Sequence, residues 1–243
     1  MDKYMEYFTN YVTMNYDINN ELIKKKYYHS LRVAKLMILL AKKMNLNDDD
    51  ILLSFKIGLC HDLGRFHEAN VNGIFDNSVF DHGAYSNKIL YNDAFIKYMD
   101  ISEHLLFRKA IYCHNKKELN NNLNNREMLF ANMIRDIDKI DIIGQRVLGS
   151  ELKIFNEANV NVLNNYLNNL NIDIKDIESK TDSAILYLSF IKDLVFEESF
   201  DLAINGNYLS NLLEIIDVSS DKKDLFNNLI NKIYERRGKV YVR

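Results

Sequence analysis

Proline is absent from all 243 residues of the chain, and only eight residues are glycine. Tight hairpins and the turns of β-sandwiches depend on these two residue types, because proline fixes φ and glycine allows positive φ. Long helices joined by polar turns need neither, and asparagine tracts such as residues 120–122 can form those turns. The sequence therefore predicts an all-α fold.

Four of the six histidines fall into one spaced pattern together with two acids. The pattern consists of His29, the adjacent pair His61-Asp62, His82, His114 and Asp138. Imidazole and carboxylate are the side chains that hold zinc, manganese or iron in catalytic sites. An adjacent His-Asp pair flanked by histidines on separate segments is hard to explain by packing alone. We therefore predict a metal site, with room for two ions.

Helical periodicity is strongest around the first histidine. One apolar stripe holds Leu22, His29, Val33, Leu36, Leu40 and Met44. This stripe directs His29 inward. A second helix is expected to begin at Asn47 or Asp48 and to end near Gly64, with Asp62 facing the core from its last turn. Residues 65–80 show no hydrophobic periodicity, so we expect a long ordered loop there.

Two further helices are expected to deliver the next histidines. Asp81 is expected to cap a helix that carries His82, and Ser102 a helix that ends near His114.

The last acid of the pattern is expected on a helix that starts at Asn124 or Asn125. On this helix Asp136 faces away from the apolar side, whereas Asp138 and Asp141 fall on it. Burial of a carboxylate costs several kcal/mol unless a cation compensates it. Either Asp138 or Asp141 is therefore the inward ligand.

The order His29, His61-Asp62, Asp138 resembles the H…HD…D signature of the HD superfamily of metal-dependent phosphohydrolases. Residues 61–66 (HDLGRF) are similar to the HD doublet of that superfamily, and residues 135–141 (RDIDKID) are similar to the helix that supplies its last ligand. In such helices the acid before lysine is the ligand, so the resemblance implies Asp138 rather than Asp141.

The resemblance covers residues 20–145 and implies an HD-domain helical bundle. No linker rich in glycine, proline or serine follows it. We therefore expect a single α-helical domain over residues 1–243, with residues 146–243 as a helical extension packed on the core.

His82 and His114 are absent from the minimal family pattern and resemble the ligands of its binuclear members. By this resemblance Asp62 bridges two metals, with His29, His61 and Asp138 on one of them and the two additional histidines on the other. The alternative is that His82 and His114 cap helices or form core hydrogen bonds. The expected cofactor is one or two divalent ions of Mn, Fe, Zn, Co, Ni or Mg.

A bound metal lowers the pKa of water, so that hydroxide is available at neutral pH. Two divalent ions against two ligand carboxylates leave a formal charge of about +2, which favours an anionic substrate. Asp62 and Arg65 are the predicted catalytic residues, and the guanidinium of Arg65 suits bidentate contact with phosphate. Alternatively, Arg65 forms a salt bridge to Asp76 or Asp81.

His67 and Lys139 are further candidates for substrate binding. His67 follows the HD doublet in the expected loop, and Lys139 lies beside the last ligand acid. Together with Arg65 they form the predicted substrate-binding set.

The predicted function is phosphoester hydrolysis, by a phosphatase or phosphodiesterase acting on a nucleotide or a related phosphomonoester or diester. Two alternatives use the same ligands. One is an HD-type di-iron oxygenase, and the other is a sensor that binds a nucleotide at a metal site without turnover.

Composition gives expectations about partners and location. The net charge of −3 predicts no specific nucleic-acid binding, and no apolar run has the length of a membrane span. Two cysteines, Cys60 and Cys113, are too few for a disulfide framework, so we expect a cytoplasmic protein with both thiols buried rather than bound to metal. The apolar residues of the C-terminal helices, such as Leu186 and Phe190, could form a homodimer interface as readily as they could pack in the core.

Overall fold

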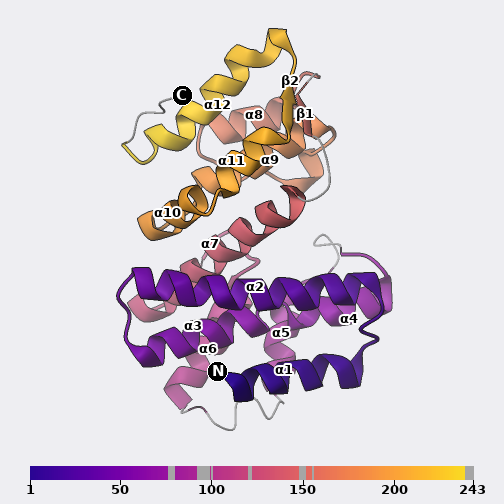
Figure 1. Ribbon diagram of the computed structural model, residues 1–243, viewed down its shortest axis with the longest axis vertical. Coiled ribbons are helices and arrows are strands. Elements are labelled where there is room, and N and C mark those ends of the chain that lie inside the picture. The colour runs from indigo at the N-terminus through magenta and orange to yellow at the C-terminus, as the bar shows by residue number, and fades with distance from the viewer. Residues whose placement is uncertain are drawn as a thin grey trace. The chain divides into compact units, whose positions relative to one another are not determined.

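The computed structural model describes residues 1–75, 80–91, 99, 101–119, 122–147, 152–154 and 156–238. Helices dominate these residues (Figure 1), which confirms the all-α prediction. The described strands are β1 (Leu152–Ile154) and β2 (Ile216–Val218), which pair in parallel with Leu152 opposite Ile216.

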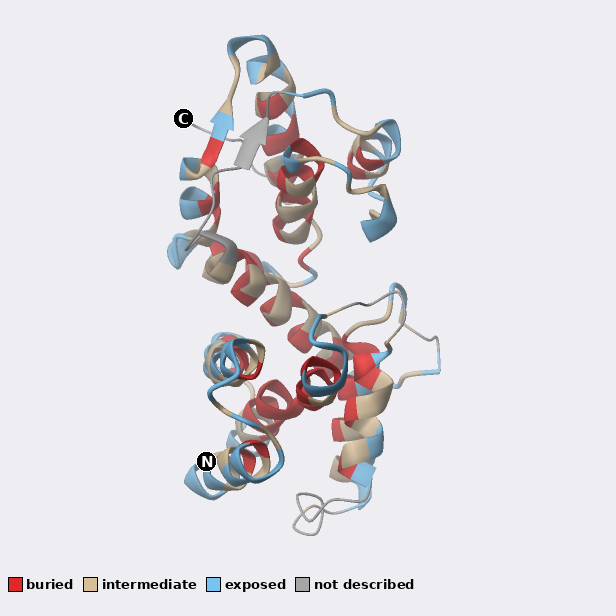
Figure 2. Cartoon of the chain, turned by 90° about the vertical axis from the view of Figure 1, so that its right-hand side faces the viewer, coloured by how far each residue is buried: buried red, intermediate tan, exposed pale blue. Residues whose placement is uncertain are grey.

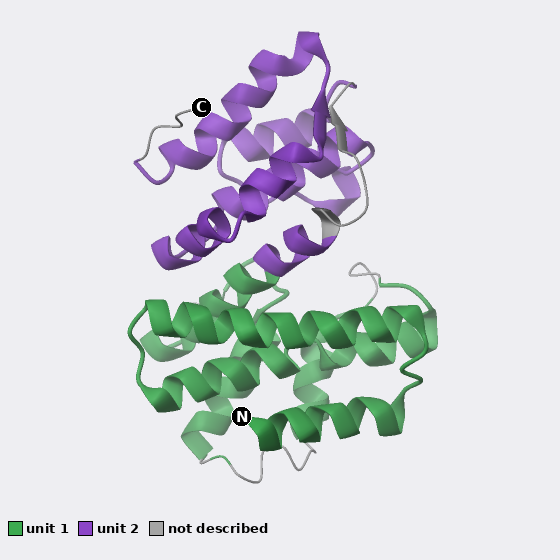
Figure 3. Ribbon diagram, in the orientation of Figure 1, with its two compact units in different colours: residues 1–138 green, residues 139–243 purple. Residues whose placement is uncertain are grey.

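The chain divides into two compact units, residues 1–138 and residues 139–243 (Figure 3). The first unit contains α1 (Asp2–Asn15), α2 (Glu21–Lys43), α3 (Asp48–Cys60), α4 (Leu63–Asn72), α5 (His82–Tyr91) and α6 (Ile101–Cys113). The boundary between the units falls within α7 (Asn125–Val147). The single domain expected over residues 1–243 stays a prediction.

Each unit has buried residues of its own (Figure 2). In the first unit α2 packs against α3 and α4, α4 packs against α5, and α6 packs against α3 and α5. Its fully buried apolar side chains include Val33, Met37, Leu40, Leu53, Ile57, Phe66, Phe107 and Ile111. Burial of such side chains is the main stabilising contribution to a helical bundle of this kind.

Several helix starts follow the predicted caps. The side chain of Asn47 accepts a hydrogen bond from the Asp50 amide at the start of α3, over 2.9 Å. At the start of α7 the Asn124 side chain accepts from the Glu127 amide, while the Glu127 carboxylate accepts from the Asn124 amide. This reciprocal arrangement is a capping box.

The α5 cap is also as predicted, but the α6 cap is not. The Asp81 carboxylate accepts a hydrogen bond from the Ala84 amide over 3.0 Å, one residue before α5 begins at His82. Ser102 is the second residue of α6, which begins at Ile101, so it does not cap that helix.

The boundary after the second helix differs from the prediction. Helix α3 ends at Cys60, residues 61 and 62 form a turn, and α4 begins at Leu63. The loop expected from residue 65 is therefore wrong as far as Asn72, because these residues are helical. Gly73, with φ of 66°, ends α4. Residues 76–79 of the expected loop lie outside the described residues.

The second unit contains α8 (Val160–Leu167), α9 (Lys180–Lys192), α10 (Glu197–Asn205), α11 (Tyr208–Glu214) and α12 (Lys223–Glu235). Helix α9 packs against α8, α12 and β1. The fully buried Lys192 donates a hydrogen bond to the carbonyl oxygen of Tyr166, in the last turn of α8. Among the described helices of both units, none combines the length and apolar character needed to cross a bilayer.

Candidate metal centre

All six side chains predicted to bind metal converge in the first unit. His29 lies in the middle of α2, His61 and Asp62 form the turn between α3 and α4, and His82 begins α5. His114 follows the last residue of α6, and Asp138 lies on α7. All except Asp138 are buried, and the Asp138 side chain is 21% exposed.

The first group of donor atoms surrounds His29. Its Nε2 atom lies 3.2 Å from Nε2 of His61, 3.2 Å from Oδ1 of Asp138 and 3.3 Å from Oδ2 of Asp62. Two ligands on one metal ion, each bound at about 2.1 Å, lie about 3.0–3.4 Å apart at ordinary coordination angles. The first group therefore has the spacing of a ligand set.

The second group contains His82 and His114. Their Nε2 atoms lie 3.0 Å apart, and these atoms lie 3.5 Å and 3.4 Å from Oδ1 of Asp62. One oxygen of Asp62 thus faces the first group and the other faces the second. The rings of His82 and His114 are both directed at Asp62, and their role as ligands stays a prediction.

Backbone carbonyls orient two of the imidazole rings. Nδ1 of His61 lies 2.8 Å from the carbonyl oxygen of Gly58, and Nδ1 of His114 lies 2.6 Å from that of Ile111. Each Nδ1 therefore carries the proton and donates it, which leaves the Nε2 lone pair directed at the centre. This is the tautomer that a metal ligand requires.

A cation would suit these donor atoms. The Nε2 atoms of His82 and His114 lie 3.0 Å apart, so without an ion one of the two rings must carry a proton there and donate it to the other. The buried Oδ1 of Asp138 accepts no hydrogen bond from the described residues. A divalent ion would satisfy both requirements.

The electrostatics of the centre favour the ligand forms of these groups. Burial alone would raise the pKa of Asp62, but Lys26 and His61 outweigh burial and hold that pKa well below its ordinary value. Burial lowers the pKa of His61 and of His82, in spite of the neighbouring Asp62. At neutral pH Asp62 is therefore a carboxylate, and His61 and His82 are neutral imidazoles, as metal binding requires.

Lys26 is a site residue that the sequence reasoning missed. Its Nζ atom lies 2.6 Å from Oδ2 of Asp62, and its side chain is 16% exposed. Lys26 could have been identified from its position three residues before His29 on α2, because this spacing places both side chains on one face of the helix.

Arg135 was also missed, and it holds the turn that carries His114. Its guanidinium donates hydrogen bonds to the carbonyl oxygens of Cys113 and Lys117, each over 3.2 Å, and to that of Lys116. These contacts fix the chain around His114 relative to α7, the helix that carries Asp138.

Asn115 links the same turn to α5. Its side-chain amide lies 3.0 Å from Oδ1 of Asp81 and 3.3 Å from Nδ1 of His82. The carboxylate of Asp81 also forms an ion pair with Lys116. This network therefore links the ring of His82 to the turn that directly follows His114.

The predicted substrate residues lie on different faces of α4 and on α7. Arg65 is buried and forms an ion pair of 2.6 Å with the fully buried Glu68, one turn along the helix. This partner is neither of the two predicted for it, and Asp76 lies outside the described residues. His67 stacks on Tyr85 with ring centroids 4.4 Å apart.

The remaining predictions concern α7 and the cysteines. Asp136 is fully buried, so the prediction that it faces away from the core is wrong. Asp141 accepts a hydrogen bond from Gln145 over 2.6 Å and is not among the clustered donors, unlike Asp138. Lys139 is half-buried, and its role stays a prediction. Both cysteines are buried and free, as expected.

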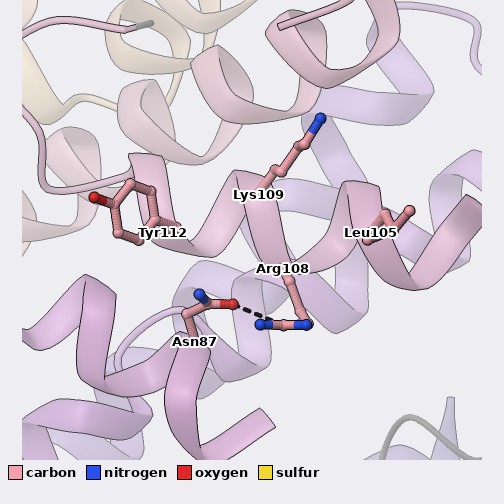
Figure 4. A pocket seen from close by; sticks show the side chains of 5 residues that line it. All are labelled: Asn87, Leu105, Arg108, Lys109 and Tyr112. Atoms are coloured by element: carbon pink, nitrogen blue, oxygen red, sulfur yellow. Dashed lines mark hydrogen bonds between the residues drawn. The ribbon is translucent and has the colours of Figure 1, made fainter. Parts of the chain in front are cut away.

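A separate hollow of about 270 Å³ lies on the surface between α5 and α6 (Figure 4). It is lined by Asn87, Leu105, Arg108, Lys109 and Tyr112. Arg108 donates a hydrogen bond to Asn87 over 2.8 Å. None of the residues predicted for the metal site or the substrate lines this hollow.

Comparison with protein families finds that residues 27–143 match the family model of the HD domain. Comparisons with curated proteins and with solved structures found no match. The matched segment contains all six clustered side chains and lies within the range that the sequence motifs predict.

Proposed function

We propose, from the premise that residues 27–143 belong to the HD domain family, that this chain is a phosphohydrolase that cleaves a phosphoester bond with two divalent ions. HD domain proteins bind divalent metals, and the domain generally denotes a metal-dependent phosphohydrolase. The observation that supports the proposal most directly is the position of Asp62, whose two carboxylate oxygens face two separate imidazole groups.

The six clustered side chains are the proposed ligands. His29, His61 and Asp138 would hold one ion, His82 and His114 would hold the other, and Asp62 would bridge the two ions. When bound, divalent ions supply hydroxide at neutral pH by lowering the pKa of water. The burial of the ligand side chains excludes bulk water, so charge interactions in the site are only weakly screened.

Arg65 is the proposed contact for a substrate phosphate. Glu68 fixes its guanidinium from one side, so less conformational entropy is lost when an anion binds. The substrate class that we propose is a phosphorylated small molecule, such as a nucleotide. His67 and Lys139 remain proposed substrate contacts, and a cytoplasmic location and a homodimer remain predictions.

The proposal is tested by element-specific metal analysis of untagged protein together with a hydrolysis screen. The protein is loaded in turn with Mn, Fe, Zn, Co, Ni or Mg and offered nucleotides, cyclic dinucleotides and aryl phosphates. We expect turnover of at least one phosphoester by wild type and none by Asp62→Ala. A fully metal-loaded protein that is inert toward every one of these compounds would overturn the proposal.

The same screen distinguishes the two alternatives. The six ligands could equally hold two irons, because ligand identity does not separate redox from hydrolytic metals. Hydrolysis that continues in the absence of oxygen would contradict the oxygenase alternative. A sensor would bind a nucleotide without releasing phosphate, with similar affinity before and after metal removal.

A further inference from the structure

The hollow between α5 and α6 contains none of the proposed metal ligands (Figure 4). Helix α6 contributes four of its five lining residues, and α5 contributes Asn87. The four are Leu105, Arg108, Lys109 and Tyr112, and their spacing of three or four residues places them along one side of α6. Pockets that take drug-sized molecules have about 300–1,000 Å³. A hollow of about 270 Å³ therefore suits a small compound rather than a nucleotide.

Arg108 brings a fixed positive charge to this hollow. Its Nε atom donates a hydrogen bond to Asn87 over 2.8 Å, and its guanidinium carbon lies 4.5 Å from the centre of the Tyr91 ring. Within the described part of the chain, the terminal nitrogens of Arg108 have no acceptor and no acid pairs with this residue. A guanidinium held in this way presents a planar pair of donors, which matches the two oxygens of a carboxylate.

The second cation of the hollow is already neutralised. The Nζ atom of Lys109 lies 2.6 Å from Oε1 of Glu127, the acid that caps the start of α7. Of the two lining cations, Arg108 alone is therefore uncompensated by a described acid. One positive charge is balanced by a carboxylate, which carries one negative charge near neutral pH, rather than by a phosphate monoester, which carries about two.

The rest of the lining offers apolar surface. Leu105 is 49% exposed and Tyr112 is 43% exposed, so both have surface that a ligand can cover. The Nζ atom of Lys116 lies over the Tyr112 ring, 4.5 Å from its centre, which leaves the ring edge and the other face for a ligand. An aromatic ring placed against these two side chains removes apolar surface from water and so favours binding.

We propose that the hollow between α5 and α6 binds a small aromatic carboxylate. The carboxylate accepts hydrogen bonds from the terminal nitrogens of Arg108, and the ring packs against Leu105 and Tyr112. The inference does not depend on the proposed function, because no proposed metal ligand lines the hollow.

The test uses three probes: benzoate, benzamide and acetate. Benzamide has the shape of benzoate without its charge, and acetate has the charge without the ring. Each is titrated by calorimetry into metal-loaded full-length protein. We expect benzoate to bind at least about tenfold more tightly than benzamide, since a hydrogen bond to a charged group has about this effect. Acetate should bind more weakly than benzoate, because it covers no apolar surface in the hollow.

Two variants test the role of Arg108. Asn87→Asp keeps the shape of the side chain but places a carboxylate on the guanidinium, so it should abolish the preference for benzoate over benzamide. Arg108→Met should do the same. Lys88→Met is the matched control, because Lys88 is an exposed cation beside Asn87 on α5 that does not line the hollow. It should bind all three probes as wild type does, and circular dichroism checks the fold of each variant.

A carboxylate could also bind at the metal ions, and Asp62→Ala separates the two places. We expect this folded variant to bind benzoate as wild type does, although it retains no metal. Loss of benzoate binding in Asp62→Ala would overturn the site in the hollow and leave the proposed function standing. The inference is also overturned if wild type binds benzoate no more tightly than benzamide or acetate, or if Asn87→Asp and Arg108→Met keep the preference.

Discussion

A Cβ atom on Gly64 would lie 2.4 Å from the carbonyl oxygen of His82, so no larger residue fits between α4 and the start of α5. The Gly64 amide also donates a hydrogen bond to the Ser86 hydroxyl over 2.8 Å. This close approach brings Asp62, which directly precedes α4, to the ring of His82. A glycine that could be taken for a helix stop in the sequence is instead a packing residue of the centre.

Gly64→Ala should therefore push α4 away from α5 and weaken the second ligand group. Overpacking of this kind costs about 1–3 kcal/mol of unfolding free energy. We expect a lower thermal midpoint, measured by calorimetry, together with partial loss of metal. Ser86→Ala is the matched control, because it removes the hydrogen bond but adds no atom. If Gly64→Ala retains full metal content and stability, the close contact is not what positions His82.

Asp62→Ala should abolish both metal retention and turnover, because one carboxylate faces both imidazole groups. Removal of a side chain that supports only one group should leave the other ion in place. The measurement is metal content after gel filtration, with circular dichroism to check the fold. A variant that keeps one ion would show that Asp62 does not bridge.

Removal of Arg65 should spare metal binding and impair substrate binding. Arg65→Ala would also take an ion-pair partner from the fully buried Glu68, a loss that can cost about 3–5 kcal/mol. The double variant Arg65→Met with Glu68→Gln avoids the buried charge. We expect it to keep both ions while kcat/KM for the best substrate falls by about tenfold or more. Metal loss equal to that of Asp62→Ala would contradict this role.

Arg135→Met should weaken the second ligand group selectively. The guanidinium supports the turn that follows α6, and loss of such an outer contact typically costs about 10–100-fold in metal affinity. The affinity is measured by competition with a chelator. Arg126→Met is the control, since Arg126 lies on the same helix and pairs with Asp50 instead. Equal losses in the two variants would mean that Arg135 acts through general stability.

Metal removal should destabilise the first unit, because an ion that binds only the folded protein shifts the equilibrium toward the folded state. A ligand present at about 100 times its Kd stabilises the folded state by about 2.7 kcal/mol. We expect the thermal midpoint to fall after chelation and to recover on addition of the metal found in the untagged protein. An unchanged midpoint would indicate that the cluster binds no ion.

The ligand residues could be predicted from the sequence because their chemistry is rare and their spacing is regular. His29 lies on an apolar helical stripe, and only a cation or a hydrogen-bond network explains a histidine there. For Asp138, helical periodicity alone left Asp141 as an alternative, and the resemblance selected between them. The structure separates the two acids, because Asp141 contacts Gln145 whereas Asp138 lies beside His29.

The end of the second helix could not be predicted because two glycines compete for the role of helix stop. The predicted helix ends near Gly64, but Gly64 lies inside α4, and Gly73 is the glycine with positive φ that ends α4. Nothing local in the sequence distinguishes a glycine required by a neighbouring helix from one required by backbone conformation. The difference depends on the position of His82, which lies 18 residues further along the chain.

The burial of Asp136 and the contacts of Arg135 could not be predicted for a related reason. A helical wheel assigns one inner face, but α7 is covered on more than one side. Arg135 donates to carbonyl oxygens near His114. Every residue has a backbone carbonyl, so the sequence does not show which one will accept a hydrogen bond. Contacts of this kind depend on the fold rather than on residue spacing.

Only two residues separate α3 from α4, and both are proposed ligands. A helix turns by about 100° per residue, so one residue inserted between α3 and α4 would rotate the side of α4 that carries Arg65 relative to Asp62. Surface loops elsewhere can accommodate an insertion by changing conformation. The two-residue connection between α3 and α4 is too short to do so. The number of residues between α3 and α4 should therefore be constrained more strictly than the identity of most side chains around this connection.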